Sequence, residues 1–196
     1  MAIKSFTRST IENNIFYRSM LAGNAFYNPS DEDILAEEVL TSSQASVTFS
    51  NLVASYGSTY QHLQIRAVAQ HTTGGLDTDY MRINGVSTNS YSWHQLRGNG
   101  STVSSIAGST TDKMFVQFVG DDTNKFGVAI IDILDPFETT KYTTIRSFTG
   151  GEDDAGGKLV GLLSGLYQAT TAVDSISINA STGSLNTGSR FTLIGL

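Results

Sequence analysis

The sequence of 196 residues contains no cysteine and only two prolines. Without cysteine the chain forms no disulfide, binds no zinc through thiolates and uses no thiol nucleophile. Basic residues are also scarce, with 12 Lys and Arg against 18 Asp and Glu, which gives a net charge of −6 at pH 7. This balance disfavours non-specific binding to phosphate backbones and anionic membranes, so we expect no nucleic-acid partner.

Long apolar runs are missing as well. The N-terminus carries charges and amides where a signal peptide needs an apolar stretch. No later segment is long enough to cross a bilayer as a helix. We therefore expect neither export by a signal peptide of this type nor membrane insertion.

The composition favours short strands joined by turns. Nineteen glycines and many Ser and Thr accompany Val, Ile, Phe and Tyr, while helical periodicity is nearly absent. Such regular spacing is typical of a sandwich or barrel, and the number of strands suits a jelly roll. The sequence thus predicts an all-β fold, a jelly-roll-like antiparallel β-sandwich. The predicted strands are 34–41, 46–50, 62–70, 80–84, 91–97, 114–119, 128–134, 142–148, 159–168, 173–179 and 190–194.

The segment 126–148 predicts the hairpin at the centre of this fold. Residues 128–134 are apolar on both alternating faces except at Asp132, which is typical of a strand covered on both sides. An Asp-Pro turn at 135–136 then leads to a half-buried partner strand at 142–148.

Alternation also assigns side chains to faces. On 62–70 we expect three polar side chains to face outward: Gln64, Arg66 and Gln70. On 159–168 two glycines, Gly161 and Gly165, predict close approach of a facing strand rather than a ligand loop. The predicted core contains Leu63, Ile65, Ala67, Ala69, Ile131, Ile176 and Ile178, with Leu193 or Ile194.

The first residues differ from the rest because they lack alternation. We predict an irregular or partly helical N-terminal arm at 1–33, followed by the β-sandwich domain at 34–196. Aromatic residues are depleted in disordered segments, so we interpret the arm as an element of attachment or oligomerisation that packs on a neighbouring surface. Its expected contacts are Phe6, Phe16, Tyr17, Phe26 and Tyr27.

Residues that could carry chemistry are scattered. His62, His71 and His94 lie on separate elements, and none has a metal-ligating neighbour at close spacing. The acidic loops at 121–124 and 152–154 lack the regular spacing of a calcium loop. No nucleophile-elbow pattern is present either. We therefore predict no catalytic residue, no metal and no cofactor.

One saccharide site is conceivable at Tyr91, Trp93 and Arg97, which share one predicted strand. An aromatic ring face suits the apolar side of a pyranose, but a lone tryptophan more often belongs to the core. Both interpretations remain open at this point.

Seven stretches of predicted strand and turn residues carry one resemblance. They are SVTFSNL at 46–52, YQHLQIR at 60–66, YSWHQLRGNGSTVSS at 91–105, IDILD at 131–135, KYTTIR at 141–146, GLLSGLY at 161–167 and GSRFTLIG at 188–195. In these stretches the chain resembles a family of phage-encoded virion structural proteins of tailed phages that infect aquatic bacteria. Because they are mostly scaffold residues, the resemblance carries over no catalytic residue.

The resemblance implies a non-enzymatic phage virion structural protein, exposed on the surface as a capsid decoration or tail-appendage subunit. Its location would be the virion, after assembly in the cytoplasm of the bacterial host. Its partners would be other virion proteins of the capsid or tail and further copies of itself, which we expect to form a homotrimer because identical chains usually assemble with closed symmetry. The alternative is a receptor-binding adhesin at the tip of a tail fibre or spike, which recognises a host surface saccharide.

Overall fold

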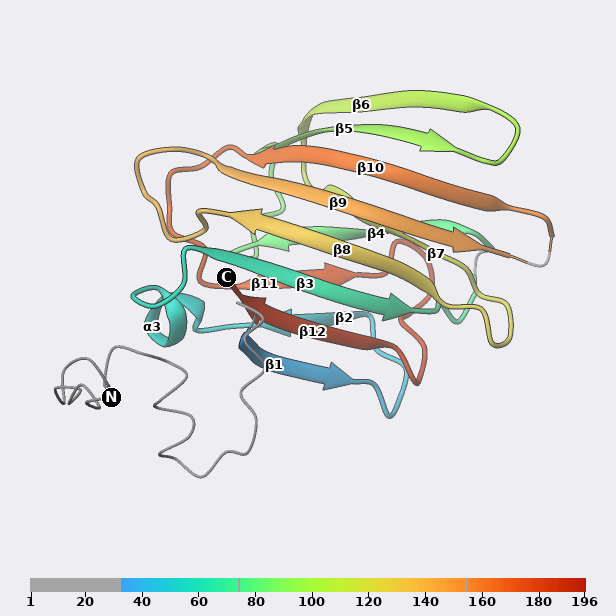
Figure 1. Ribbon diagram of the computed structural model, residues 1–196, viewed down its shortest axis with the longest axis horizontal. Helices are drawn as coiled ribbons and strands as arrows, with labels where there is room; N and C mark the ends of the chain where they lie inside the picture. Colours follow the sequence, from blue (N-terminus) through green and yellow to red (C-terminus); the bar gives the residue numbers. More distant parts are fainter. Residues whose placement is uncertain (1–32, 74, 154) are drawn as a thin grey trace, which may run out of the picture. The chain divides into compact units, whose positions relative to one another are not determined.

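The computed structural model describes residues 33–73, 75–153 and 155–196. These residues form twelve strands and one short helix (Figure 1). The elements are β1 (Asp33–Val39), β2 (Ser46–Phe49), α3 (Leu52–Tyr56), β3 (His62–Ala69), β4 (Asp77–Ile83), β5 (Tyr91–Gly98), β6 (Val103–Thr111), β7 (Met114–Val119), β8 (Gly127–Leu134), β9 (Thr143–Glu152), β10 (Lys158–Tyr167), β11 (Ile176–Asn179) and β12 (Arg190–Gly195). Residues 1–32 of the predicted arm lie outside the described residues, and so do its five aromatic side chains, Phe6, Phe16, Tyr17, Phe26 and Tyr27, whereas Asp33 is the first residue of β1.

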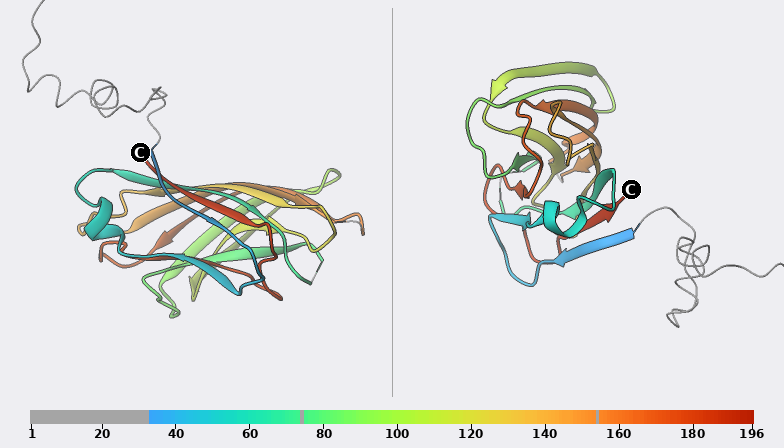
Figure 2. Two further views of the ribbon diagram at one scale, coloured as in Figure 1. Left: turned by 90° about the horizontal axis from the view of Figure 1, so that it is seen from below. Right: turned by 90° about the vertical axis from the view of Figure 1, so that its left-hand side faces the viewer.

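The strands form two antiparallel sheets that pack as a sandwich (Figure 2). The large sheet has eight strands in the order β1-β12-β3-β8-β9-β10-β5-β6, and the small sheet has four in the order β2-β11-β4-β7. The quartets β1-β12-β3-β8 and β2-β11-β4-β7 have the strand order of an eight-stranded jelly roll made of two Greek keys. The hairpins β9–β10 and β5–β6 extend one of its sheets. The predicted all-β jelly-roll-like sandwich is confirmed.

All eleven predicted strands are present, and the central hairpin is confirmed as the antiparallel pair β8 and β9. Two elements were not predicted, namely β6 and the single turn of α3. β6 escaped prediction because its Ser, Thr, Gly and Ala residues show no apolar alternation. In the part of the chain described here, no helix is long and apolar enough to span a membrane.

The core between the sheets follows the alternation. Gln70, however, was predicted to face outward and is only 6% exposed. It follows β3 where distant loops close over the end of the sandwich, and Asn186 Nδ2 donates to Gln70 Oε1 at 2.9 Å. Seven predicted core residues are confirmed as buried, namely Leu63, Ile65, Ala67, Ala69, Ile131, Ile176 and Ile178, and both alternatives, Leu193 and Ile194, are buried as well.

Close approach at the two glycines of β10 is also confirmed. A Cβ atom at Gly161 would lie 2.7 Å from the ring of Phe118, and one at Gly165 would lie 2.4 Å from the carbonyl oxygen of Ser92 and 2.8 Å from the sulfur of Met114. These side chains come from β7, at the edge of the small sheet. The inner face of the large sheet is therefore tightly packed.

The prediction that the strand at 128–134 is covered on both sides is wrong. β8 lies in the middle of the large sheet, but only its inner face packs against another layer of the described residues (Figures 1 and 2). Val128 and Ile130 point outward and remain 50% and 44% exposed. The outer face of the large sheet is thus open in the described part of the chain.

Candidate functional site

The outer face of the large sheet carries a contiguous group of exposed apolar side chains, which we call the outer apolar patch. Each member keeps 40% to 55% of its surface exposed. Its members come from β3, β5, β8, β9 and β10 and are Val68, Leu96, Val128, Ile130, Phe148, Val160 and Leu162.

Strand register brings these residues together, although they are far apart in the sequence. One row crosses β8, β9, β10 and β5 through Ile130, Phe148, Leu162 and Leu96. The next row crosses β3, β8, β9 and β10 through Val68, Val128, Gly150 and Val160. Directly opposed residues on one face of a sheet are in side-chain contact distance, so the two rows form one continuous surface.

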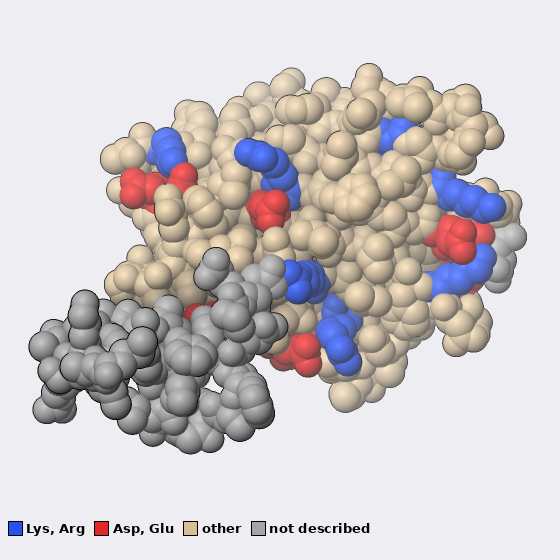
Figure 3. All heavy atoms as spheres, viewed as in Figure 1, with Lys and Arg blue, Asp and Glu red and all other residues tan. Residues whose placement is uncertain are grey.

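The patch is large for a protein of this size. Its seven half-exposed side chains present on the order of 600 Å² of apolar surface, at the upper end of the roughly 300 to 600 Å² typical of the largest patch on a monomer. Figure 3 looks onto this face, where uncharged surface covers the middle of the sheet and charged side chains lie around it. Such a surface marks a contact site rather than ordinary solvated protein.

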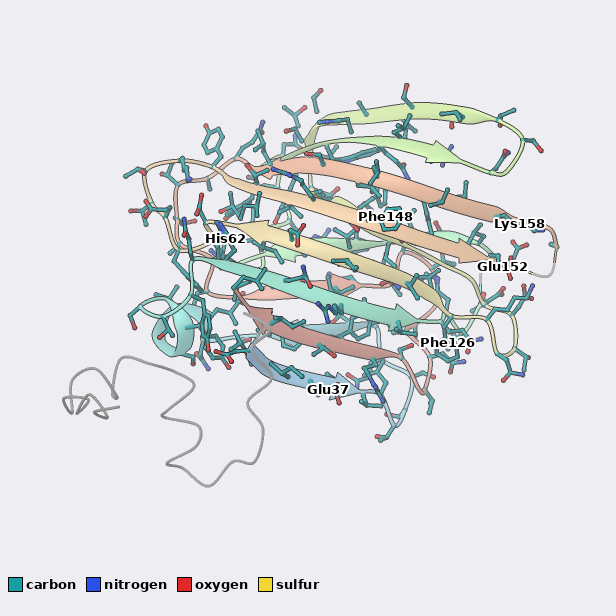
Figure 4. All side chains as sticks on the ribbon, viewed as in Figure 1. Glu37, His62, Phe126, Phe148, Glu152 and Lys158 are labelled. Atoms are coloured by element: carbon teal, nitrogen blue, oxygen red, sulfur yellow. The ribbon has the colours of Figure 1, made fainter. Side chains whose placement is uncertain are left out.

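The patch has a protruding side chain, Phe148, between two hollows. Phe148 stands at the middle of the face on β9 (Figure 4) and lines both hollows, which measure about 420 Å³ and about 380 Å³. The smaller hollow lies over Gly150, which places no side chain between Val128 and Val160. Its lining is almost entirely apolar, and Arg66 lies at its border.

Polar residues border the patch at both ends. At one end Asp132 pairs in register with Arg146, and Gln64 Nε2 donates to Asp132 Oδ1 at 2.9 Å. At the other end Glu152 pairs in register with Lys158, and both lie at the same end of the sheet in Figure 4. The apolar centre is therefore framed by an acid and a base at each end.

The three histidines are not brought together. His62 accepts a hydrogen bond at Nδ1 from the backbone N–H of Asp135 at 3.0 Å, while His94 is exposed on the outer face of β5. His71 is fully buried, with its Nε2 atom 2.5 Å from Asp79 Oδ1. Within the described ranges, no group of three or more His, Asp or Glu residues could hold a metal ion.

His71 and Asp79 form a buried pair of titratable side chains. Burial raises the pKa of the Asp79 carboxyl, and the hydrogen bond from His71 opposes that rise. Both side chains are completely inaccessible. The pair therefore joins the loop after β3 to β4 inside the fold and offers no surface to a ligand.

The residues of the predicted saccharide site lie on the inner side of β5. Tyr91 is fully buried, and its hydroxyl accepts from the backbone N–H of Ile83 at 2.9 Å. Trp93 is 8% exposed and packs edge-on against Phe115 with ring centroids 5.0 Å apart. Arg97 is half-buried, and its Nε donates to Ser104 at 3.3 Å. Neither ring offers an open face on which a sugar could stack.

Comparisons with known proteins found no counterpart. No protein-family model matches the chain, and neither a curated protein nor a solved structure matches it. The fold and the surface together define a class, a jelly-roll sandwich with one open apolar sheet face. The resemblance to phage virion structural proteins gains no support from these comparisons and remains a prediction.

The patch itself was missed, although the sequence contained its signal. Val128 and Ile130 made residues 128–134 apolar on both faces, and this pattern was interpreted as cover by the chain's own layers. The same pattern is also expected of a strand whose second face is covered by another molecule. Phe148 and Leu162 occupy the outward positions of their own strands and point to the same conclusion.

Proposed function

We propose that this chain is a non-enzymatic structural subunit of a phage virion, exposed on the particle as a capsid decoration protein or a tail-appendage subunit. The observation that carries the proposal is the outer apolar patch. A protein that works as part of an assembly covers such a surface with a neighbouring subunit, whereas a free monomer would leave it in water.

Two further features support this proposal. The first is the breadth of the outer sheet face, which belongs to an eight-stranded sheet of the sandwich and is large enough for contact between proteins. The resemblance of seven stretches to virion structural proteins supplies the kind of assembly. We assign attachment to the particle to the N-terminal arm, whose five aromatic residues suit docking on a virion protein of the capsid or tail.

Copy number in purified particles tests the proposal. Quantitative mass spectrometry on virions of the phage that encodes the chain should detect it at a fixed ratio to the major capsid protein. A ratio typical of capsid symmetry sites would indicate decoration, and a much lower fixed ratio would indicate the tail. Absence from particles that are otherwise complete would refute the proposed function.

Deletion of residues 1–29 tests the role of the arm. We expect the truncated chain to keep its thermal unfolding midpoint, because every described strand begins after this segment. It should nevertheless be lost from particles, since the aromatic anchors are gone. Incorporation at wild-type occupancy would show that attachment does not depend on the arm.

A further inference from the structure

We propose that the outer apolar patch is a self-complementary interface, on which a second copy of this chain packs face to face across a twofold axis. This inference rests on the proposed function as a structural subunit and names the surface and the partner. It differs from the threefold assembly expected from the sequence, because a twofold axis uses the same patch on both copies.

The first argument is the shape of the patch. Phe148 protrudes with 55% of its surface exposed, and Gly150, two residues further along β9, leaves a hollow of about 380 Å³. A twofold axis that crosses β9 at the level of Thr149 would place Phe148 of each copy opposite Gly150 of the other. A hollow of this size is within the range of roughly 300 to 1,000 Å³ of pockets that accept small ligands, so it accommodates one aromatic ring.

Steric freedom at Gly150 strengthens this argument. A Cβ atom there would meet only the carbonyl oxygen of Leu159, at an ordinary 3.6 Å. Packing within the chain therefore does not require glycine at this position, in contrast to Gly161 and Gly165 on the inner face. The hollow is a property of the outer surface, and an inserted ring from a second copy would use it.

The second argument is the area. The patch presents on the order of 600 Å² of apolar surface. A standard protein interface buries roughly 800 Å² per partner, of which a little more than half is non-polar. The patch alone therefore supplies the apolar centre that a stable pair needs, and the polar residues at both of its ends supply the rim.

The third argument is charge. The same twofold axis places Arg146 opposite Glu152 of the second copy, because these residues lie three positions on either side of Thr149. Asp132 stands beside Arg146 in register, and Lys158 stands beside Glu152. Each end of the interface would then join one acid and one base from each copy, while the seven members of the patch are uncharged. Such pairing fixes orientation and disfavours other registers.

The geometry is also one that sheets adopt. Two sheets pack face to face about 10 Å apart with their strands inclined by about 30°, so that side chains of the facing layers interdigitate. Crossed β9 strands at the centre of such a pair keep Phe148 and Gly150 in reach of each other. Residues farther from the axis contribute less, because the inclination moves them apart.

Size-exclusion chromatography with light scattering on the full chain tests the pairing. Over roughly 1 to 100 µM, where modest interfaces dissociate, the wild type should approach twice the chain mass of 21.0 kDa. Phe148→Asp should remain monomeric, because it places a charge at the centre of the interface. The matched control is Tyr142→Asp, which changes an exposed aromatic residue in the β8–β9 connection outside the patch and should pair like the wild type.

Two further variants make the test specific to the proposed geometry. Gly150→Val fills the hollow from a Cβ position that has ordinary room inside the chain, and it should raise the dissociation constant at least tenfold although it adds apolar surface. Arg146→Glu and Glu152→Arg should each weaken pairing, and the double variant should restore part of it, because the swapped charges attract across the interface but meet like charges at Asp132 and Lys158 within each copy. Circular dichroism should show the same unfolding midpoint for all variants within a few degrees.

Several results would overturn the inference. They are a wild type that stays monomeric throughout the range, a trimer, or pairing that survives Phe148→Asp and Gly150→Val unchanged. A monomer in solution that is nevertheless found in virions would refute the pairing and leave the proposed function intact. A dimer in solution that is absent from virions would refute the proposed function and leave the pairing intact.

Discussion

The inner and outer faces of the large sheet carry the same apolar residue types, but the inner face is buried and the outer face is exposed. Ile130 and Ile131 are adjacent on β8, yet Ile131 is completely buried while Ile130 is 44% exposed. The difference lies in what covers each face, because the small sheet packs on the inner one and no described layer packs on the outer one. An apolar pattern on a strand therefore indicates that a sheet face is buried by something. It does not indicate whether the burying layer belongs to the same chain or to another molecule.

The glycines of the two faces repeat this contrast. On the inner face Gly165 is required by close packing, since a Cβ atom there would lie 2.4 Å from a backbone oxygen. On the outer face Gly150 has ordinary room for a Cβ atom. The interior thus constrains residue identity through contacts that are visible in one chain, whereas the outer face is free of such constraints until another molecule binds.

The largest expected effect separates the two neighbouring isoleucines. Ile131→Asp should prevent folding, because an unpaired buried carboxylate costs several kcal/mol against a total stability of about 5 to 15 kcal/mol. Ile130→Asp should fold with little change in the free energy of unfolding and should lose self-association. Urea denaturation followed by circular dichroism measures both variants. A soluble Ile131→Asp protein with the wild-type unfolding midpoint would contradict the assignment of β8 to the core.

An intermediate effect is expected for the glycines. Gly165→Ala should destabilise the fold by roughly 1 to 3 kcal/mol, because the new methyl group forces a shift of Ser92 or Met114. Gly150→Ala should change stability by no more than about 0.5 kcal/mol, as is usual for exposed positions. The comparison is made by urea denaturation of both variants under identical conditions. Equal costs at the two positions would show that the inner and outer faces do not differ as described.

Local alternation was sufficient to predict much of the fold. The inward residues of β3 and the hairpin of β8 and β9 follow from a period of two and from one Asp-Pro turn. β6 was not predictable in this way, because Ser, Thr and Gly residues are equally typical of a turn. Gln70 was misassigned because its partner Asn186 is 116 positions away in the sequence.

The site was less predictable than the fold for a physical reason. The patch exists only once β10 has paired with both β9 and β5, which brings Phe148, Leu162 and Leu96 into one row. Nothing local in those three segments specifies that pairing. Trp93 is the only tryptophan of the chain, and its ring faces inward on β5. Leu96, an outward residue of the same strand, belongs to the patch.

The smallest expected effect concerns Asp135, in the turn that follows β8. Lys141 donates a hydrogen bond to the Asp135 carboxylate, Gln61 donates another at 3.3 Å, and His62 lies close by. These contacts, Lys141 first among them, hold the pKa of Asp135 below its ordinary value of 3.8. A carboxyl whose pKa is lower in the folded state stabilises the fold above its unfolded pKa, and this contribution is lost as pH falls through the folded value.

Lys141→Met should therefore flatten the acid side of the stability profile. Between pH 7 and pH 3 the wild type should lose slightly more free energy of unfolding than the variant, and the difference should shrink in high salt because Lys141 is exposed. Urea denaturation at both pH values provides the measurement, with Lys158→Met as a control, since Lys158 lies at the opposite end of the sheet from His62, which neighbours Asp135 (Figure 4). If both lysine variants follow the wild-type profile, the contacts of Asp135 contribute nothing measurable to the stability of the fold.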